Sequence, residues 1–300
     1  MIDVINIDEV DYNSYPNQEK KYATWIKTGD TYTPIVDSEI QNKLEPGLYQ
    51  VQNDRGGQLI CKKQNLDNDT LICFEDSIFN DVSAEISKFW NLKDKYKDNH
   101  LIHKRGILLE GPAGNGKSSL ITLTIENLIK NSGIAFVIKN VESFYKTIEF
   151  QKNILRKIEP ETPIITIIED IDVFPDYALS DLLDYLDGKG SIDHSICLMT
   201  TNDSSELSPA LLRPSRIDKR YIIDYPNESL RKRYFIFKNI PKDLLDKYVE
   251  STKGFSFAKL KELYVSTIIL GNDFNETITI LEEEIEGKNY LEKDKLQIEL

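Results

Sequence analysis

The stretch RGILLEGPAGNGKSS, residues 105–119, decides the fold of this chain. It begins as an apolar run typical of a strand, passes through three glycines, and ends where a helix is predicted to begin. Its middle matches the pattern GxxxxGK[ST], the phosphate-binding P-loop, and its flanks are the strand and the helix that this motif requires. The stretch therefore predicts an α/β fold built around a nucleotide site.

The chemistry of a phosphate chain explains why these residue types stand together. The chain of phosphates carries several negative charges, and glycines let the backbone curl so that successive N–H groups point inward. The helix that begins near Lys117 adds its positive dipole end. We expect Lys117 to reach the β- and γ-phosphates and Ser118 to ligate Mg²⁺, so ATP and Mg²⁺ are the predicted cofactors. The predicted nucleotide-binding residues here are Gly111, Pro112, Ala113, Gly114, Asn115, Gly116, Lys117, Ser118 and Ser119.

A second informative stretch is PIITIIEDIDVF, residues 163–174. An apolar strand is predicted to end at Ile168, and Glu169 and Asp170 follow at its carboxyl end, where open α/β sheets bind their ligands. One carboxylate at that place can hold Mg²⁺ through water, and the other can orient or deprotonate the attacking water. Together with the P-loop, this pair is predicted to be the Walker B acids.

The organisation of the chain follows from its apolar runs. The predicted strands of the central region are 107–109, 134–138, 164–168, 196–200 and 221–223. Uniformly apolar strands that alternate with helices imply a five-stranded parallel sheet covered on both faces. We expect three parts: a small β-rich amino-terminal domain of unknown role over 1–100, an α/β ATPase subdomain over 101–226, and an all-α lid over 227–300.

Composition limits the classes of function. The 37 basic residues are outnumbered by 50 acidic ones, and the net charge of −13 argues against a surface that coats nucleic acid. Cys61, Cys73 and Cys197 lie in apolar stretches and are expected to be buried free thiols. The chain shows neither a signal-peptide pattern nor an apolar run of the roughly 18 residues that span a bilayer. We therefore expect a cytoplasmic protein without a membrane partner.

Several motifs in a fixed order resemble the AAA+ ATPases, in particular their AAA subgroup, over roughly residues 101–270. RGILLEGPAGNGKSS is similar to the Walker A segment of that family and IIEDID to its Walker B segment. MTTND, residues 199–203, resembles the sensor 1 strand. LSPALLRPSRIDKRYIIDYP resembles the second region of homology, and TKGFSFAKLKEL resembles the lid segment that holds sensor 2. The resemblance implies a P-loop NTPase core, a small helical lid and ATP hydrolysis.

The order of the two Walker B acids departs from the usual pattern of the family. Here Glu169 precedes Asp170, an inversion that resembles the mitochondrial chaperone-type AAA ATPases that help to assemble respiratory complex III, and their bacterial and phage relatives. Those mitochondrial proteins carry an amino-terminal membrane span, which this sequence does not show. A bacterial cell or a phage-infected host is the expected setting. By position Glu169 would support Mg²⁺ and Asp170 would orient the lytic water, or the two roles are exchanged.

The resemblance assigns roles to residues outside these clusters. Asn202 would be sensor 1, close to the γ-phosphate and the attacking water. Arg213 and Arg216 would be arginine fingers that reach the nucleotide of a neighbouring subunit, and the resemblance therefore implies a homo-oligomeric ring, a hexamer. His103 lies in a segment that borders the adenine in relatives and would contact the base. The predicted catalytic residues are Asp170, Glu169, Asn202, Arg213 and Arg216, and the predicted metal ligands are Ser118, Glu169 and Asp170.

The lid segment and the pore region leave alternatives open. The sensor 2 arginine is absent, because Ser256, Phe257 and Ala258 occupy its place. This absence is common in the AAA subgroup and disfavours clamp-loader-type relatives. Phe144 and Tyr145 follow the second strand, where the family carries a pore loop, but no glycine follows them. They either line a pore or pack against the next helix.

Three functions agree with these features. The first is a ring-forming motor that hydrolyses ATP to remodel or translocate a protein substrate. The second is a nucleic-acid-linked factor such as a helicase loader or a clamp-loader-like protein, which the acidic balance disfavours. The third is a slow, ATP-dependent assembly switch, which the complete set of catalytic residues disfavours.

Overall fold

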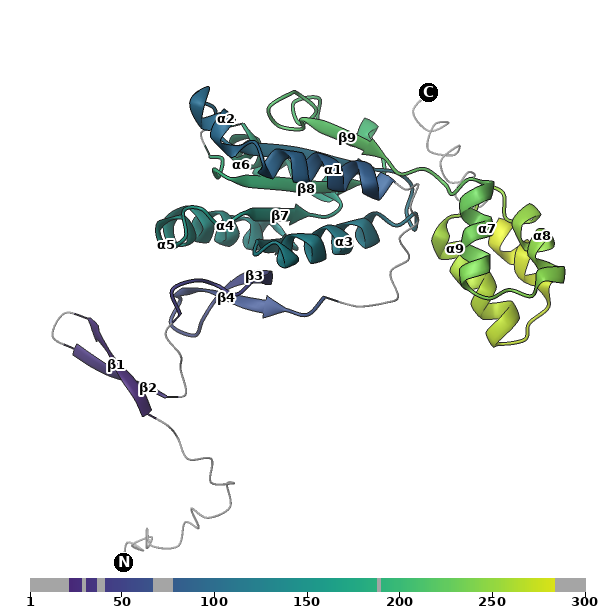
Figure 1. The fold of residues 1–300 in the computed structure, drawn as a ribbon, viewed down its shortest axis with the longest axis horizontal. Coiled ribbons are helices and arrows are strands. Elements are labelled where there is room, and N and C mark those ends of the chain that lie inside the picture. Colours follow the sequence, from purple (N-terminus) through teal and green to yellow (C-terminus); the bar gives the residue numbers. More distant parts are fainter. Residues whose placement is uncertain (1–21, 29–30, 37–40, 67–77, 188–189, 284–300) are drawn as a thin grey trace, which may run out of the picture. The chain divides into compact units, whose positions relative to one another are not determined.

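The computed structural model describes residues 22–28, 31–36, 41–66, 78–187 and 190–283 of the chain, and Figure 1 shows them as a ribbon. The chain divides into two compact units, Met1–Leu44 and Glu45–Leu300. In the first unit, strands β1 (Tyr22–Thr28) and β2 (Thr31–Val36) form an antiparallel hairpin. None of the helices that the structure describes is long and apolar enough to cross a membrane.

The second unit contains one mixed sheet of seven strands. The strands are β3 (Gly47–Asn53), β4 (Leu59–Gln64), β5 (Lys104–Glu110), β6 (Ile134–Ile138), β7 (Ile164–Ile168), β8 (Ser195–Thr201) and β9 (Lys219–Ile222). Their order across the sheet is β4-β3-β6-β7-β8-β5-β9. Five neighbouring strands of this order, β6, β7, β8, β5 and β9, run parallel, as the apolar runs predict. The expected α/β class and parallel core are therefore confirmed.

A second hairpin, formed by β3 and β4, enlarges this sheet, which the sequence pattern did not predict. Strand β3 pairs in parallel with β6, and β4 pairs antiparallel with β3. Tyr49 and Val51 alternate along β3 and are both buried, and the ring of Tyr49 lies 6.2 Å from that of Phe136. The structure thus divides the chain after Leu44 rather than near residue 100, because a buried face of β3 has its partner in β6.

Helices cover the sheet on both faces. The helices are α1 (Ile78–Trp90), α2 (Lys93–Asp98), α3 (Lys117–Lys130), α4 (Val141–Phe150), α5 (Arg156–Ile158), α6 (Asp176–Leu186), α7 (Glu228–Phe237), α8 (Lys242–Glu250) and α9 (Phe257–Tyr264). Short π- or 3₁₀-turns are Gln151–Leu155, Ile171–Val173, Ser204–Glu206 and Val265–Ile269. Helices α1 and α3 bury their apolar stripes against alternate residues of the central strands, such as Ile107 and Leu109. On the other face, Phe150 of α4 packs against Phe136 of β6.

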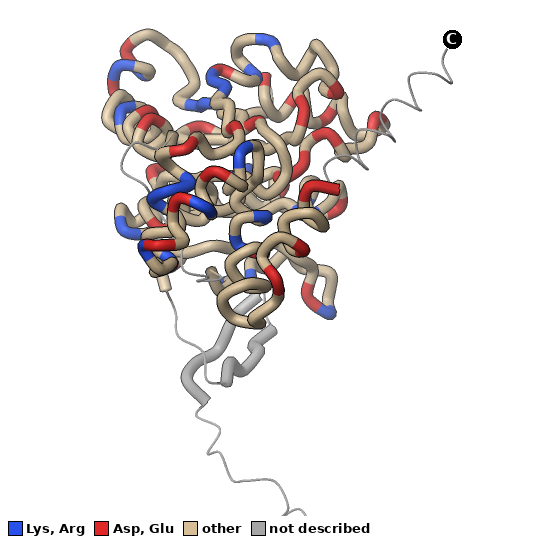
Figure 2. The backbone as a smooth tube through the Cα atoms, turned by 90° about the vertical axis from the view of Figure 1, so that its right-hand side faces the viewer, with Lys and Arg blue, Asp and Glu red and all other residues tan. Residues whose placement is uncertain are grey.

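The helices after residue 227 build a core of their own. It includes Phe235, Tyr248, Phe255, Leu260 and Leu263, all of them buried. This core gives the expected lid a physical basis, since it shares no member with the core of the sheet. Figure 2 shows acidic and basic positions interspersed over the second unit.

The cysteines differ from one another in burial. Cys197 is buried in β8, where burial raises the pKa of its thiol to about 12. Cys61 on β4 is only partly buried, contrary to expectation, because β4 is the edge strand of the sheet. Cys73 lies outside the described residues.

Candidate active site

The P-loop connects the end of β5 to the start of α3. Gly116 caps α3 in a left-handed conformation with φ of 95°, which glycine adopts without steric cost. At Gly111 a Cβ atom would lie 2.0 Å from the carbonyl oxygen of Ile223, so no side chain fits there. The loop therefore curls tightly between β5 and α3, as expected for a phosphate cradle.

The P-loop lysine meets the predicted sensor residue directly. Lys117 is 8% exposed, and its ammonium donates hydrogen bonds to the carbonyl oxygen of Gly111 at 2.6 Å and to Oδ1 of Asn202 at 2.8 Å. Burial lowers the pKa of the Lys117 ammonium, while Asp170 and Asp172 act in the opposite direction. Residues 85 positions apart thus converge at the carboxyl edge of the sheet, because β5 and β8 are neighbours in it.

The predicted magnesium ligands also converge. The Ser118 hydroxyl donates to Oε2 of Glu169 at 2.9 Å. A hydroxyl and carboxylates are the oxygen ligands that Mg²⁺ prefers. In the described part of the chain, no group of three His, Cys, Asp or Glu side chains is placed to hold a metal ion. An ion beside Ser118 would therefore complete its shell with phosphate oxygens and water, as Mg²⁺ usually does at nucleotides.

Asp170 occupies a different position from Glu169. Its backbone is left-handed, with φ of 49°, and its N–H donates to the Thr200 hydroxyl at 2.8 Å. Both acids are exposed, and the Glu169 carboxylate accepts a hydrogen bond from the Ser118 hydroxyl of the P-loop. Glu169 therefore contacts the P-loop through its side chain, whereas Asp170 contacts β8 through its backbone.

Two residues of this edge have buried polar atoms without a partner in the described part of the chain: Asn115, a predicted nucleotide-binding residue, and Asp172, which the sequence analysis missed. Oδ1 of Asp172 is buried and has no hydrogen-bond partner among the described residues. The amide of Asn115 is 3% exposed, and both of its polar atoms lack such a partner. Buried polar groups normally have partners, so these atoms fit a site that a ligand or water completes. The third acid in EDID was the available signal for Asp172.

A third network joins the base of the P-loop to the sensor segment. Oε2 of Glu110 accepts a bond from Arg220 at 2.6 Å, and its Oε1 accepts one from the Ser204 N–H at 3.2 Å. Although partial burial acts to raise it, the pKa of Glu110 is held below its usual value by the bonds from Arg220 and Ser204. Arg220 therefore links β9 to the segment that follows Asn202.

The two predicted finger arginines lie at the other end of β5. Their loop leads into β9, and the Asp218 N–H donates to the carbonyl oxygen of Gly106 at 2.9 Å. Roughly 16 Å of extended strand separates Gly106 from Gly111. Arg216 donates to Oδ2 of Asp187 at 2.8 Å, whereas Arg213 is exposed and has no polar partner in the described ranges. Neither arginine approaches the P-loop of its own chain.

His103 is not near the P-loop either. It precedes β5 and is 2% exposed, with its ring stacked on Phe89 at 3.9 Å between centroids. Its Nδ1 lies 2.8 Å from Nδ1 of His194, and its Nε2 lies 2.9 Å from the carbonyl oxygen of Phe89. The geometry does not support the expected adenine contact, because these buried contacts fully occupy the ring at the wrong end of the strand.

The two candidate pore residues differ in burial, and the lid contacts the P-loop. Phe144 is 2% exposed and packs against Phe174 and Tyr185, so it belongs to the core. Tyr145 is 43% exposed, and its hydroxyl donates to Asp181 at 2.5 Å. In the lid, the Ala258 N–H donates to the carbonyl oxygen of Gly114 at 3.0 Å. The lid thus contacts the P-loop through its backbone.

Comparisons with known proteins agree with this site. Residues 107–225 match the family model described as "ATPase family associated with various cellular activities (AAA)". The chain is similar to an AAA-ATPase of Arabidopsis thaliana, with 32% identity over 227 residues that cover 67% of this chain and 43% of that protein. It is also similar to the probable mitochondrial chaperone bcs1 of Schizosaccharomyces pombe, with 26% identity over 210 residues, 65% of this chain and 45% of that protein.

A third relative is a proteasome subunit. The 26S proteasome regulatory subunit 6B homolog of Aspergillus niger is 30% identical over 166 residues, which cover 49% of this chain and 38% of that protein. The chain spans less than half the length of each of these three relatives. The residues that match the family model include the P-loop, the Glu169–Asp170 pair and Asn202. Residues 107–225 of the chain are therefore an AAA ATPase domain.

Proposed function

We propose that this chain is a ring-forming ATPase motor whose active site is completed by an arginine of a neighbouring copy. One observation carries the proposal: Arg213 and Arg216 lie at the amino end of β5, whereas Lys117 lies beyond its carboxyl end. An arginine that stabilises a developing phosphoryl charge accelerates related reactions by about 10³–10⁵. A second copy, docked with its arginine loop against the P-loop edge, would supply that charge.

The residues of one copy would bind the nucleotide as follows. The N–H groups of the P-loop and the amino end of α3 would hold the phosphates. Lys117 would release Oδ1 of Asn202 and donate instead to a phosphate oxygen. This needs no large movement, because the Lys117 ammonium and Asn202 already meet at this edge of the sheet. Ser118 and Glu169 would hold Mg²⁺, whose positive charge neutralises the phosphates and the charge that develops on them.

The remaining polar groups would act on the attacking water. Asp170 would accept a hydrogen bond from that water and orient or deprotonate it. Asn202, once released by Lys117, would hold the water or the γ-phosphate from the other side. Arg213, exposed and unpaired among the described residues, is the better candidate for the finger than Arg216, which already bonds to Asp187.

The names of the relatives bear on the ring and on its substrate. A hexamer that acts on a protein substrate agrees with relatives named as a chaperone and as a proteasome regulatory subunit. Residues 1–44 form a unit of their own and are a candidate for substrate recognition. Stimulation of ATP turnover by DNA instead of protein, with salt-sensitive DNA binding, would favour the nucleic-acid-linked alternative.

Mixed rings test the central claim. Lys117→Ala subunits cannot use ATP but can donate Arg213, and Arg213→Ala subunits can bind ATP but donate no finger. Each variant alone should be inactive. A one-to-one mixture should recover about a quarter of the wild-type turnover, because random assembly brings an intact site against an intact donor at one interface in four. The control replaces the first variant by the double variant Lys117→Ala/Arg213→Ala, which should rescue nothing.

Co-assembly is verified with two different affinity tags before turnover is measured. If the mixture co-assembles and stays as inactive as the control, the arginine does not act between subunits. If Arg213→Ala alone keeps the wild-type turnover, the finger role is assigned to the wrong residue.

A further inference from the structure

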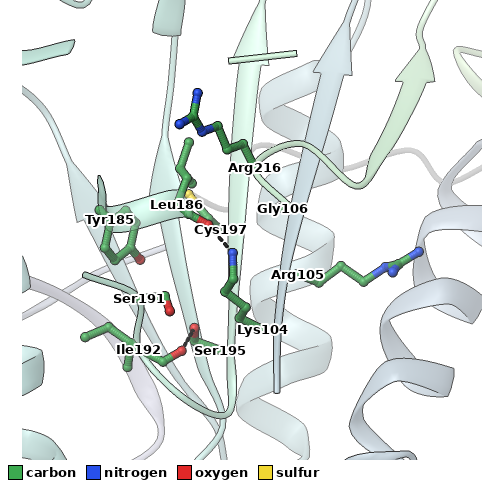
Figure 3. Close-up of a pocket in the computed structure, with 10 residues that line it drawn as sticks. All are labelled: Lys104, Arg105, Gly106, Tyr185, Leu186, Ser191, Ile192, Ser195, Cys197 and Arg216. Atoms are coloured by element: carbon green, nitrogen blue, oxygen red, sulfur yellow. Dashed lines mark hydrogen bonds between the residues drawn. The ribbon is translucent and has the colours of Figure 1, made fainter. Parts of the chain in front are cut away.

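Lys104 is a half-buried lysine that no part of the proposed chemistry uses. It is the first residue of β5, and its ammonium donates hydrogen bonds to the carbonyl oxygens of Leu186 and Ser215. Figure 3 shows its side chain directed toward Leu186, while that of Arg105 points away from β5 on the other side. Burial lowers the pKa of the Lys104 ammonium, although Asp218 and Asp187 act to raise it. A lysine held in this way has a structural task.

The two carbonyl groups belong to different elements. Leu186 is the last residue of α6, and a cation at the carboxyl end of a helix is favoured by the helix dipole. Ser215 lies between the two arginines, in a left-handed conformation with φ of 72°. Such a conformation is strained for serine and persists only where neighbours enforce it. Lys104 therefore joins the end of α6 to the arginine loop, which we define as residues 213–218.

Two carboxylates hold the same loop from either side. The Ser215 hydroxyl donates to Oδ1 of Asp187 at 2.9 Å, and Arg216 donates to the other oxygen of Asp187. Asp218 accepts from the Ser215 N–H at 3.1 Å and from the Gly106 N–H at 2.8 Å. These bonds fix Arg216 and the loop backbone, so that only Arg213 of the two arginines extends freely.

Close packing leaves the loop no room to shift toward the sheet. A Cβ atom at Gly106 would lie 1.8 Å from the carbonyl oxygen of Arg216, so the loop backbone rests directly on β5. The space beside Lys104 is only about 10 Å³. That volume holds about one water.

The elements that Lys104 joins both lead to the nucleotide edge. Strand β5 ends at Glu110, directly before the P-loop, and α6 begins at Asp176, shortly after the Walker B acids. The loop that carries Arg213 is therefore fastened to the two elements whose far ends form the chain's own active site. A displacement of either element would reach the loop through Lys104, in addition to the bonds of Asp187 and Asp218.

We propose that Lys104 is a positioning residue for the arginine loop, and that it presents Arg213 to the active site of the neighbouring copy. This inference rests on the proposed function in trans. Lys104 touches no nucleotide of either copy and acts only through the backbone of Ser215 and Leu186. Its loss should therefore damage donation of the arginine and leave ATP binding in its own copy intact.

The test asks which side of the interface fails in Lys104→Met. The variant keeps the length of the side chain and removes its charge. We expect its ATP turnover to fall by about 10- to 100-fold, as for a small misplacement of a catalytic group. Its affinity for a fluorescent ATP analogue should stay within about twofold of the wild type, because the P-loop is untouched. Lys104→Gln can still donate to one carbonyl oxygen, so its ATP turnover should lie between those of the wild type and Lys104→Met.

Mixed rings then separate donor from acceptor defects. Lys104→Met should be rescued by Lys117→Ala, which donates an intact arginine, and should not be rescued by Arg213→Ala, which donates none. If Lys104→Met does not bind ATP, the mixtures with Lys117→Ala and with Arg213→Ala are repeated with Lys104→Gln.

The outcomes distinguish this inference from the proposed function. Rescue of Arg213→Ala by Lys117→Ala, without rescue of either Lys104 variant, overturns the positioning role and leaves the finger in trans standing. Failure of the Arg213 mixture itself overturns both. Wild-type turnover in Lys104→Met and Lys104→Gln also overturns the positioning role.

Discussion

The two ends of strand β5 carry polar residues of opposite character. At the carboxyl end, Lys117 bonds to Asn202 and Ser118 bonds to Glu169, and each bond joins groups that phosphate or Mg²⁺ can replace. At the amino end, the polar side chains of His103 and Lys104 bond to backbone carbonyl groups of neighbouring elements. The difference teaches that exchangeable partners mark a binding site, whereas partners fixed by the fold mark its support.

The largest effect should follow from the loss of the lysine at the carboxyl end. Lys117→Ala removes the ammonium that the P-loop offers to the phosphates, and removal of one such group costs about 10²–10³ in rate in other enzymes. We expect calorimetry to detect little or no ATP binding and phosphate release to fall by at least that factor. The matched control is Lys130→Ala, an exposed lysine at the end of the same helix, which should leave both measurements unchanged.

The next effect separates the two acids. Asp170→Asn keeps the left-handed backbone, which asparagine tolerates, but removes the proposed base. We expect turnover to fall by about 10²–10⁴ while ATP stays bound. Glu169→Gln should instead raise the Mg²⁺ concentration needed for half-maximal turnover, because Glu169 bonds to Ser118. A normal rate in Asp170→Asn, or an unchanged Mg²⁺ requirement in Glu169→Gln, would contradict this division of roles.

The histidine pair at the amino end should give a smaller effect, on stability. Nε2 of His103 must donate to the carbonyl oxygen of Phe89, so Nδ1 of His103 accepts and Nδ1 of His194 donates. Burial, together with Lys93, His103 and Arg156, lowers the pKa of His194 to about 4. A proton on His103 at Nδ1 would break the pair, and the pKa of His103 is likewise lowered by burial.

The sign of the pH dependence follows from these pKa values. Between about pH 6.5 and pH 4 the unfolded chain binds a proton at residue 194 that the folded chain does not, so acid favours unfolding. The full shift is worth about 3 kcal/mol, at 1.36 kcal/mol per pH unit. Urea unfolding of His194→Asn should lose this part of the pH slope, whatever its absolute stability.

The chain offers a matched control for this experiment. His100→Asn changes an exposed histidine whose backbone is also left-handed, with φ of 57° against 53° at His194. Its pH slope should stay close to that of the wild type. Equal slopes in the wild type and His194→Asn would show that the buried pair does not oppose protonation.

The success of the sequence analysis depended on how local each feature is. The P-loop and the Walker B acids each lie within one strand and the turn that follows it, so their residues and spacing predicted their chemistry directly. The five apolar runs predicted the parallel sheet for the same reason. His103 was misplaced because its role was taken from the family resemblance, whereas the whole of β5 separates it from the P-loop. Tyr49 and Val51 were assigned to a separate domain because their partner strand lies far along the chain.

The sequence by itself determined the α/β class, the phosphate loop and the pair of carboxylates, since each is encoded by residues close together in the chain. Only the tertiary structure decided that Lys117 meets Asn202, that Glu110 meets Arg220, and that Lys104 holds the arginine loop. These contacts join residues 85 to 111 positions apart. They arise from the order of strands in the sheet, which depends on packing over the whole core and leaves no mark in any short stretch of sequence.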